Sequence, residues 1–139
     1  MKHRIVLDTN CLVASISKRG EYYAVWLSII SGQTVLCVSN DILFEYREIL
    51  EQQLNDVIAD RVLVLLVNLP NVVIVSPSFY FNLITSDPDD NKFVDCAIAA
   101  NARFIVSNDR HFRELRKIDF PKVEVISLIE FAESLNSKK

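Results

Sequence analysis

The amino-acid sequence predicts an α/β fold, a three-layer α/β/α sandwich in which helices cover both faces of a central parallel sheet. Half of the 139 residues are hydrophobic, which is enough for one domain with a sizeable core. The predicted strands are apolar throughout rather than alternating, which is typical of strands buried on both faces. Helical segments separate these strands, as expected for parallel pairing. We therefore expect one domain over residues 1–139.

The first half of the chain predicts two strands and four helices. Strands are expected at 4–8 and 34–38, and helices at 11–17, 21–30, 41–54 and 56–69. Short apolar runs indicate the strands, and apolar residues that recur every three or four positions indicate the helices. Gly32 closes the second helix, Ser39 and Asn40 are natural caps for the third, and Pro70 ends the fourth.

The second half continues the alternation. Strands are expected at 72–75, 104–107 and 123–126, and helices at 89–101 and 127–135. The stretch Asp87–Asp90 supplies the proline and the acidic residues of a helix start, and Ser127 caps the last helix. Residues 76–86 have no clear period and predict a loop. Lys138 and Lys139 predict a solvated tail.

Composition narrows the function classes. The net charge of −3 argues against a protein that coats nucleic acid by bulk electrostatics, although not against one that cuts it. The longest apolar stretch, Val62–Val75, is interrupted by polar residues and a proline, and no signal-like leader starts the chain. We therefore expect a soluble, cytoplasmic protein with no membrane partner. Cys11, Cys37 and Cys96 predict reduced core thiols.

Two acidic residues lie at or just beyond the carboxyl ends of predicted strands. Asp8 ends the first strand, and Asp109 lies two residues beyond Ser107 at the end of the fourth. Parallel sheets carry their sites at the carboxyl ends of the strands, where the strand order reverses. Both carboxylates are therefore candidates for a common site, although Asp8 is also a natural helix cap and Asp109 a natural turn residue.

Two further acids lie on predicted helices. Glu45 flanks the apolar stripe of its helix, and its structural alternative is a solvated flank charge. Asp95 lies in a helix that is apolar nearly all round, which predicts burial. A buried carboxylate must be paired, hydrogen-bonded or bound to a cation, and Arg103 is a candidate partner.

Together these residues resemble the PIN domain family. The resemblance consists of Asp8-Thr9-Asn10, of Glu45 in FEYREIL, of DCAIAANA from Asp95, and of FIVSND ending at Asp109. It implies a metal-dependent ribonuclease in which Asp8, Glu45, Asp95 and Asp109 are the catalytic acids and hold Mg²⁺ or Mn²⁺. The stretch DPDDNKF is especially similar to the toxins of type II toxin–antitoxin pairs. That similarity implies an RNA substrate and an antitoxin partner, and it is compatible with a homodimer.

The metal chemistry explains why acids should gather. Divalent cations activate water and relieve charge on a phosphodiester, and they prefer carboxylate oxygens. Asp90 is the alternative third acid. We favour Asp95, because the favourable interaction of Asp90 with the dipole at the helix start is enough to explain why an acid stands there. Thr9, Asn10 and Asn108 are expected to support the ligands through hydrogen bonds.

A basic run follows Asp109 and predicts a rim that binds the nucleic-acid backbone. Its members are Arg110, Arg113, Arg116 and Lys117. Its structural alternative is a solvated helix face.

Two other function classes remain open. One is a PIN-like binding module without catalytic activity, which would contact a partner through the apolar helix at 57–69. The other is a phosphotransfer enzyme or a receiver domain, which also places acids at strand ends. A phosphatase of the haloacid dehalogenase type would need an aspartate where Asn10 stands, and a receiver would need an acidic pair after the first strand. Neither pattern is met.

Overall fold

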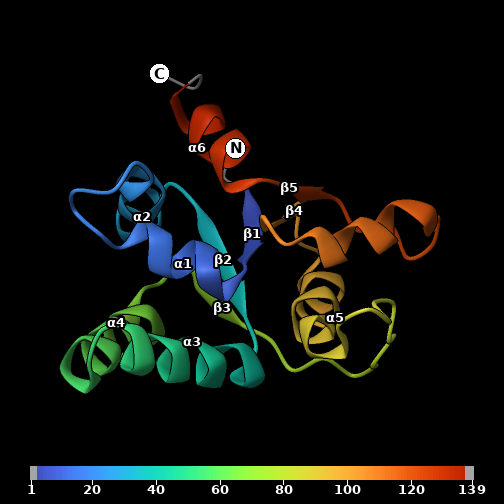
Figure 1. Cartoon of the computed structure of the whole chain (residues 1–139), viewed down its shortest axis with the longest axis horizontal. Helices are drawn as coiled ribbons and strands as arrows, with labels where there is room; N and C mark the ends of the chain where they lie inside the picture. Colours follow the sequence, from blue (N-terminus) through green and yellow to red (C-terminus); the bar gives the residue numbers. More distant parts are fainter. Residues whose placement is uncertain (1–2, 137–139) are drawn as a thin grey trace.

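The central sheet is five-stranded and entirely parallel, with the strand order β3-β2-β1-β4-β5, as Figure 1 shows for the computed structural model, which describes residues 3–136. The strands are β1 (Arg4–Leu7), β2 (Val35–Val38), β3 (Val72–Ile74), β4 (Phe104–Val106) and β5 (Val125–Ile126). The predicted α/β/α fold with a parallel sheet is confirmed. The predicted tail at Lys138 and Lys139 lies outside the described residues.

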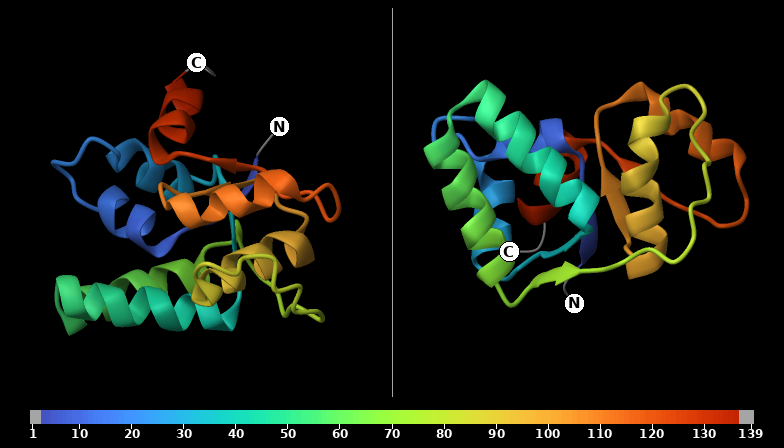
Figure 2. Two further views of the ribbon diagram at one scale, coloured as in Figure 1. Left: turned by 45° about the vertical axis from the view of Figure 1, so that its right-hand side comes forward. Right: turned by 90° about the horizontal axis from the view of Figure 1, so that it is seen from below.

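The helices follow the predicted alternation. They are α1 (Thr9–Ser15), α2 (Tyr23–Ile30), α3 (Asn40–Gln53), α4 (Asp56–Asn68), α5 (Asn91–Ala100) and α6 (Leu128–Asn136), with the 3₁₀ segments η1 (Pro88–Asp90) and η2 (Arg110–Lys117). Helix α5 packs on β1, β2 and β4, whereas α3 and α4 pack against each other (Figure 2). None of the described helices is long and apolar enough to cross a membrane.

Local sequence signals set several of the helix ends. The Ser39 hydroxyl accepts a hydrogen bond from the Ile42 N–H at 3.3 Å, and the Asn55 side chain accepts one from the Ile58 N–H at 2.8 Å. At the start of α6, Ser127 and Glu130 each accept a hydrogen bond from the backbone N–H of the other, which is a capping box. Gly32, just after α2, has a φ of 84°, which glycine adopts without strain.

The core lies on the central strands. The apolar residues of β1 from Ile5 to Leu7 are fully buried, as are Leu36–Val38 of β2 and Ile105–Val106 of β4. The edge strands β3 and β5 are only half-covered. Tyr46 is also fully buried, and its hydroxyl donates a hydrogen bond of 2.5 Å to the carbonyl of Leu7. This bond fixes α3 against the end of β1.

The strand order reverses between β1 and β4. Successive strands after β1 step outward to β3 at one edge, and the chain then crosses back to place β4 on the other side of β1. Sheets of this kind bind ligands at the carboxyl ends of the two strands that flank such a reversal. In this chain those ends carry Asp8 and Ser107.

Candidate metal centre

Asp8 leaves β1 beside the end of β4. Leu7 pairs with Val106 in the parallel register, and the Asp8 N–H donates to the Val106 carbonyl at 3.0 Å. The Ser107 hydroxyl donates a hydrogen bond of 2.7 Å to the Asp8 carboxylate. Although Asp8 precedes α1, its side chain forms no capping hydrogen bond. Burial raises the pKa of Asp8 against the effect of Ser107, and the charges of Asp109 and Glu45 raise it further.

Asp109 is held by the same serine. The Ser107 hydroxyl accepts a hydrogen bond of 3.0 Å from the Asp109 N–H, so one side chain bridges the two acids. The Asp109 carboxylate accepts a hydrogen bond of 2.9 Å from the His111 N–H, which starts η2. Burial alone would raise the pKa of Asp109, but that N–H donor and other neighbours together lower it. Asp109 is therefore a turn residue and a member of the acidic group at once.

Asp90 joins this group from the start of α5. Its side chain makes no capping hydrogen bond, it is only 9% exposed, and its Oδ2 atom has no hydrogen-bond partner. Burial raises its pKa to about 8, and the nearby charges of Asp109, Asp87 and Asp8 contribute. A buried carboxylate oxygen without a hydrogen-bond donor has a cost in free energy unless a cation binds to it.

The structure places Asp95 elsewhere, although the sequence favours it as the third acid. The Asp95 carboxylate accepts a hydrogen bond of 3.1 Å from the Phe81 N–H in the loop that follows β3. Burial raises its pKa against that hydrogen bond, and no other acid contributes. Residues five apart project about 140° from each other around an α-helix, so Asp90 and Asp95 face different surroundings. Arg103, the predicted partner of Asp95, instead lies 5.1 Å from the ring of Phe104.

Glu45 approaches from α3 and is paired with a lysine. Its carboxylate accepts a hydrogen bond from the Thr9 hydroxyl and forms an ion pair of 2.8 Å with Lys92. Lys92 also pairs with Asp89 at 3.1 Å. Burial lowers the pKa of Lys92, but its two acidic partners outweigh that effect and raise it. Glu45 therefore lies at the border of the acidic group, and Lys92 neutralises its charge.

The predicted supporting residues act differently from expectation. Thr9 contacts Glu45 rather than Asp8. The Asn108 side chain accepts a hydrogen bond of 3.0 Å from the Leu128 N–H at the start of α6, and Asn10 is exposed in the first turn of α1. Ser107 supports Asp8 through a hydrogen bond, and Lys92 neutralises Glu45. Neither role was predicted from the sequence. A polar residue at the end of β4, directly opposite Asp8 in the register, is the signal that could have identified Ser107.

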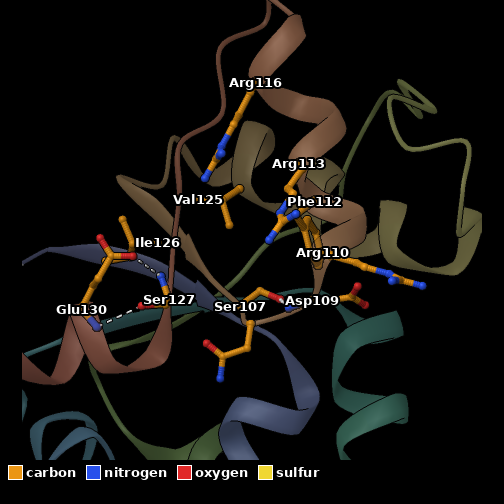
Figure 3. Close-up of a pocket in the computed structure, with 11 residues that line it drawn as sticks. Ser107, Asp109, Arg110, Phe112, Arg113, Arg116, Val125, Ile126, Ser127 and Glu130 are labelled. Atoms are coloured by element: carbon orange, nitrogen blue, oxygen red, sulfur yellow. Dashed lines mark hydrogen bonds between the residues drawn. The ribbon is translucent and has the colours of Figure 1, made fainter.

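A cleft of about 200 Å³ adjoins Asp109. The predicted rim residues Arg110, Arg113 and Arg116 line it, and Figure 3 shows Arg113 and Arg116 on η2 facing the strand that carries Val125. The buried Phe112 and Leu115 fix the other side of η2 in the core. Lys117 is exposed at the end of η2. The arginines therefore place positive charge beside the acidic group.

The donor set fits a divalent cation. The charge of Asp109 raises the pKa of Asp8, and the charges of Asp8 and Asp109 raise that of Asp90, whose Oδ2 atom also lacks a hydrogen-bond donor. Ligand atoms of Asp87, Asp90, Asp109 and His111 also lie within 4.8 Å of one another. Hard divalent ions prefer such carboxylate oxygens.

Comparison with known proteins identifies the family and supports the fold. A family model described as PIN domain matches residues 4–111. No curated protein sequence matches the chain significantly. The solved structures that share the fold include the following three. One is VapBC2 from Rickettsia felis bound to a DNA fragment from its promoter. It is 20% identical to this chain with a TM-score of 0.61, and the match covers 89% of this chain and 98% of that chain.

DNA-bound VapBC from Salmonella typhimurium is 16% identical with a TM-score of 0.55, covering 92% of this chain and 99% of that chain. The PIN domain endonuclease Utp24 is 14% identical with a TM-score of 0.52, covering 89% and 84% of the two chains. At such identities these structures show the fold alone.

Proposed function

The chain belongs to the PIN domain family, and from this premise we propose that it is a metal-dependent endoribonuclease and the toxin of a type II toxin–antitoxin pair. One observation carries the proposal: Asp8, Asp90 and Asp109 converge where the order of the parallel strands reverses. We assign the metal to these three acids, with Glu45 at the border. In this proposal residues 1–139 work as one domain in the cytoplasm, where the buried cysteines stay reduced.

The ion, Mg²⁺ or Mn²⁺, would supply a water made nucleophilic near neutral pH and would offset charge on the phosphate. The protein supplies the geometry. Ser107 holds the Asp8 carboxylate at the strand end and fixes the backbone of Asp109. Lys92 neutralises Glu45 and so limits repulsion across the acidic group.

The substrate assignment rests on the cleft beside Asp109. Arg113 and Arg116 line it, and guanidinium groups bind phosphate oxygens through paired N–H donors. The names of the similar structures, one an endonuclease and two VapBC assemblies bound to DNA, support a nuclease and a protein partner. An unpaired RNA strand is the substrate that we propose.

A binding module without catalytic activity is the second candidate function. Helix α4 exposes Val57, Val64 and Val67 at 53%, 61% and 49%, which is unusual for apolar residues on one helix. Such a surface fits a protein partner. A metal titration separates the two candidates, because a pure binding module has no need of the ion.

Asp8→Asn tests the proposed function. Asparagine has nearly the same shape and keeps an oxygen that can accept the Ser107 hydrogen bond, but it removes the charge. We expect Mn²⁺-dependent cleavage of single-stranded RNA to fall by roughly a thousandfold or more, as expected when a group that stabilises transition-state charge is lost. Asp119→Asn, an exposed substitution of the same kind, is the control.

Cleavage by Asp8→Asn at the rate of the unsubstituted protein would contradict the assignment. A single-stranded DNA of the same sequence, assayed in parallel, separates RNA from DNA specificity. Equal cleavage of both strands would contradict the proposed restriction to RNA.

A further inference from the structure

The loop that follows β3 exposes three consecutive aromatic residues. Phe79 and Tyr80 are each 70% exposed, and Phe81 is 37% exposed. The rings of Phe79 and Phe81 lie 6.1 Å apart and line one pocket beside α5, whereas Tyr80 lines a separate pocket of about 240 Å³, the Tyr80 pocket. Lys92, the partner of Glu45, also lines the Tyr80 pocket. Large aromatic side chains gain free energy from burial, so their exposure here indicates a ligand-binding surface.

The backbone of this loop is fixed at Phe81. Its N–H donates a hydrogen bond of 3.1 Å to a carboxylate oxygen of Asp95, which lies on α5 and is only 4% exposed. Within residues 3–136, the second Asp95 oxygen has no hydrogen-bond partner, and, unlike Oδ2 of Asp90, it is not sealed from solvent. Asp95 lines the Tyr80 pocket. This buried carboxylate therefore offers the pocket an unused hydrogen-bond acceptor.

The other polar groups of the pocket are a second acceptor and a donor. The Asp41 carboxylate forms no hydrogen bond or ion pair with the side chains that the structure describes. The Ser39 hydroxyl accepts a hydrogen bond of 3.3 Å from the Ile42 N–H, which leaves its own proton free to donate. Two acceptors and one donor therefore surround a space with an aromatic wall.

Guanine presents the complementary pattern. Its Watson–Crick edge carries a carbonyl oxygen followed by two adjacent donors, the ring N–H and the exocyclic amino group. Adenine and cytosine combine one amino group with a bare ring nitrogen, which a carboxylate would repel, and uracil has one N–H between two carbonyls. A flat base can also stack on the Tyr80 ring, as bases of unpaired strands do on exposed aromatic side chains. The pocket therefore fits guanine better than the other bases.

The pocket lies on the same edge of the sheet as the acidic group. Ser39 follows β2 and the aromatic loop follows β3, so both stand at carboxyl ends of parallel strands, as Asp8 does after β1. Figure 1 shows the loop continuing from β3 to α5. Neighbouring strands lie about 4.8 Å apart, so the ends of β2 and β3 are about 5 to 10 Å from that of β1. The arginine cleft lies on the other side, at the ends of β4 and β5. An RNA strand held by the arginines can therefore cross the acidic group and place a base in the pocket.

We propose that the Tyr80 pocket binds a guanine base of the RNA strand next to the cleaved bond, with Tyr80 stacking on the base and Asp41 and Asp95 accepting its donors. Base selection here rests on the proposed nuclease function. An arginine side chain of a protein partner also has paired N–H donors, but two observations favour a neutral base. Lys92 already neutralises Asp89 in this pocket, and a volume of about 240 Å³ exceeds what a guanidinium group fills.

Binding of short oligouridines to the full chain with Asp8→Asn tests the pocket while the RNA stays intact. One oligonucleotide carries a single guanosine, a second carries inosine at that place, and a third is uridine throughout. Inosine lacks only the exocyclic amino group of guanosine. Fluorescence anisotropy should show the guanosine oligonucleotide bound at least about fivefold more tightly than the other two, because each of those loses a donor to a carboxylate.

Variants of the pocket separate stacking from hydrogen bonding. Tyr80→Ala should weaken binding of the guanosine oligonucleotide by about fivefold or more, and Tyr80→Phe should retain the affinity, because only the ring is needed for stacking. Phe79→Ala removes an equally exposed ring from the neighbouring pocket and should change the affinity by less than about twofold. Asp41→Asn should lower the preference for guanosine over inosine, whereas Asp56→Asn, also in the first turn of a helix, should keep it.

Equal affinities for the three oligonucleotides would overturn the proposal, a result that does not depend on the folding of any variant. Equal weakening by Phe79→Ala and Tyr80→Ala would also overturn it. Binding of acetylarginine amide that Tyr80→Ala abolishes, without a preference among the bases, would assign the pocket to a protein partner instead. Metal-dependent RNA cleavage without a preference for guanosine would contradict the pocket alone, whereas the absence of both RNA binding and cleavage would contradict the nuclease proposal itself.

Discussion

At the scale of single residues, Ser107 determines how two acids meet. Its hydroxyl donates to the Asp8 carboxylate and accepts from the Asp109 N–H, so one small side chain links the ends of β1 and β4. Asp90 completes the group without any such bond. This end of the sheet therefore has two carboxylates ordered by one hydroxyl and a third, Asp90, whose charge is stabilised only when a cation binds and which otherwise keeps its proton up to about pH 8.

Asp90 should make the metal-free protein less stable as the pH rises. Its folded-state pKa of about 8 lies above the ordinary value of 3.8, so the folded state binds the proton more tightly than the unfolded chain. The contribution is therefore neutral below about pH 4 and becomes destabilising as the pH rises towards 8. Asp90→Asn should remove this slope and stabilise the metal-free protein at pH 8 by on the order of 1 to 3 kcal/mol.

Urea unfolding with a metal chelator, at pH 5 and at pH 8, measures this difference. Asp119→Asn, at an exposed position, should keep the slope of the unsubstituted protein. A lower free energy of unfolding for Asp90→Asn than for the unsubstituted protein at pH 8 would contradict this prediction.

At the scale of secondary structure, local signals predicted most elements. The buried strands are continuous apolar runs, and the predicted caps Ser39 and Ser127 accept hydrogen bonds from backbone N–H groups at the starts of α3 and α6. Segment η2 was predicted only as the alternative to a nucleic-acid rim, a solvated helix face, and its 3₁₀ form was not predicted; Phe112 and Leu115, its buried residues, stand three apart among charged neighbours. A 3₁₀ segment aligns residues three apart, which two apolar positions are too few to reveal.

The candidate site was harder to predict, because its membership depends on non-local geometry. Asp8 and Asp109 could be placed together because strand ends in a parallel sheet share an edge. The choice between Asp90 and Asp95 depends on how α5 is rotated about its axis, which sequence spacing leaves open. The role of Ser107 depends on the register between β1 and β4, and the Glu45–Lys92 pair depends on how α3 meets α5.

Glu114 should control the order of the segment before η1. Groups of Ser86 and Thr85 donate hydrogen bonds to its carboxylate and lower its pKa to about 2. Because the folded pKa lies below the ordinary 4.5, this stabilisation is present above about pH 4.5 and is lost as the pH falls towards 2. Glu114→Gln should therefore increase amide hydrogen exchange at Thr85 and Ser86 at neutral pH, with little change in the free energy of unfolding.

Hydrogen-exchange mass spectrometry of peptides covering residues 76–90 gives the measurement. Glu133→Gln, an exposed substitution on α6, should leave these peptides unchanged. Equal protection in Glu114→Gln and the unsubstituted protein would mean that the hydrogen bonds of Asn91 with Ile84 and of Asp95 with Phe81 are sufficient to order this segment.

At the scale of the whole molecule, charge is distributed unevenly. The chain carries a net charge of −3, yet Arg110, Arg113 and Arg116 line one cleft beside Asp109. A protein of this overall charge would repel a phosphate backbone over much of its surface, so binding must depend on a local cationic region. The divalent ion and the arginines would act together, because each reduces the repulsion that the acidic group presents to RNA.

Charge reversal at this cleft should therefore weaken RNA binding and reduce its dependence on salt. Each phosphate contact with a single strand contributes about 0.7 to the slope of log affinity against log salt, so losing two contacts should lower that slope by roughly 1.4. Arg113→Glu combined with Arg116→Glu is the test, made in the Asp8→Asn background to preserve the RNA. The control is Arg61→Glu combined with Lys122→Glu, both at exposed positions away from the residues that line the cleft, with the same change in net charge. Fluorescence anisotropy across a salt series gives both quantities, and equal loss of affinity in the two double variants would show that overall charge, rather than this cleft, governs binding.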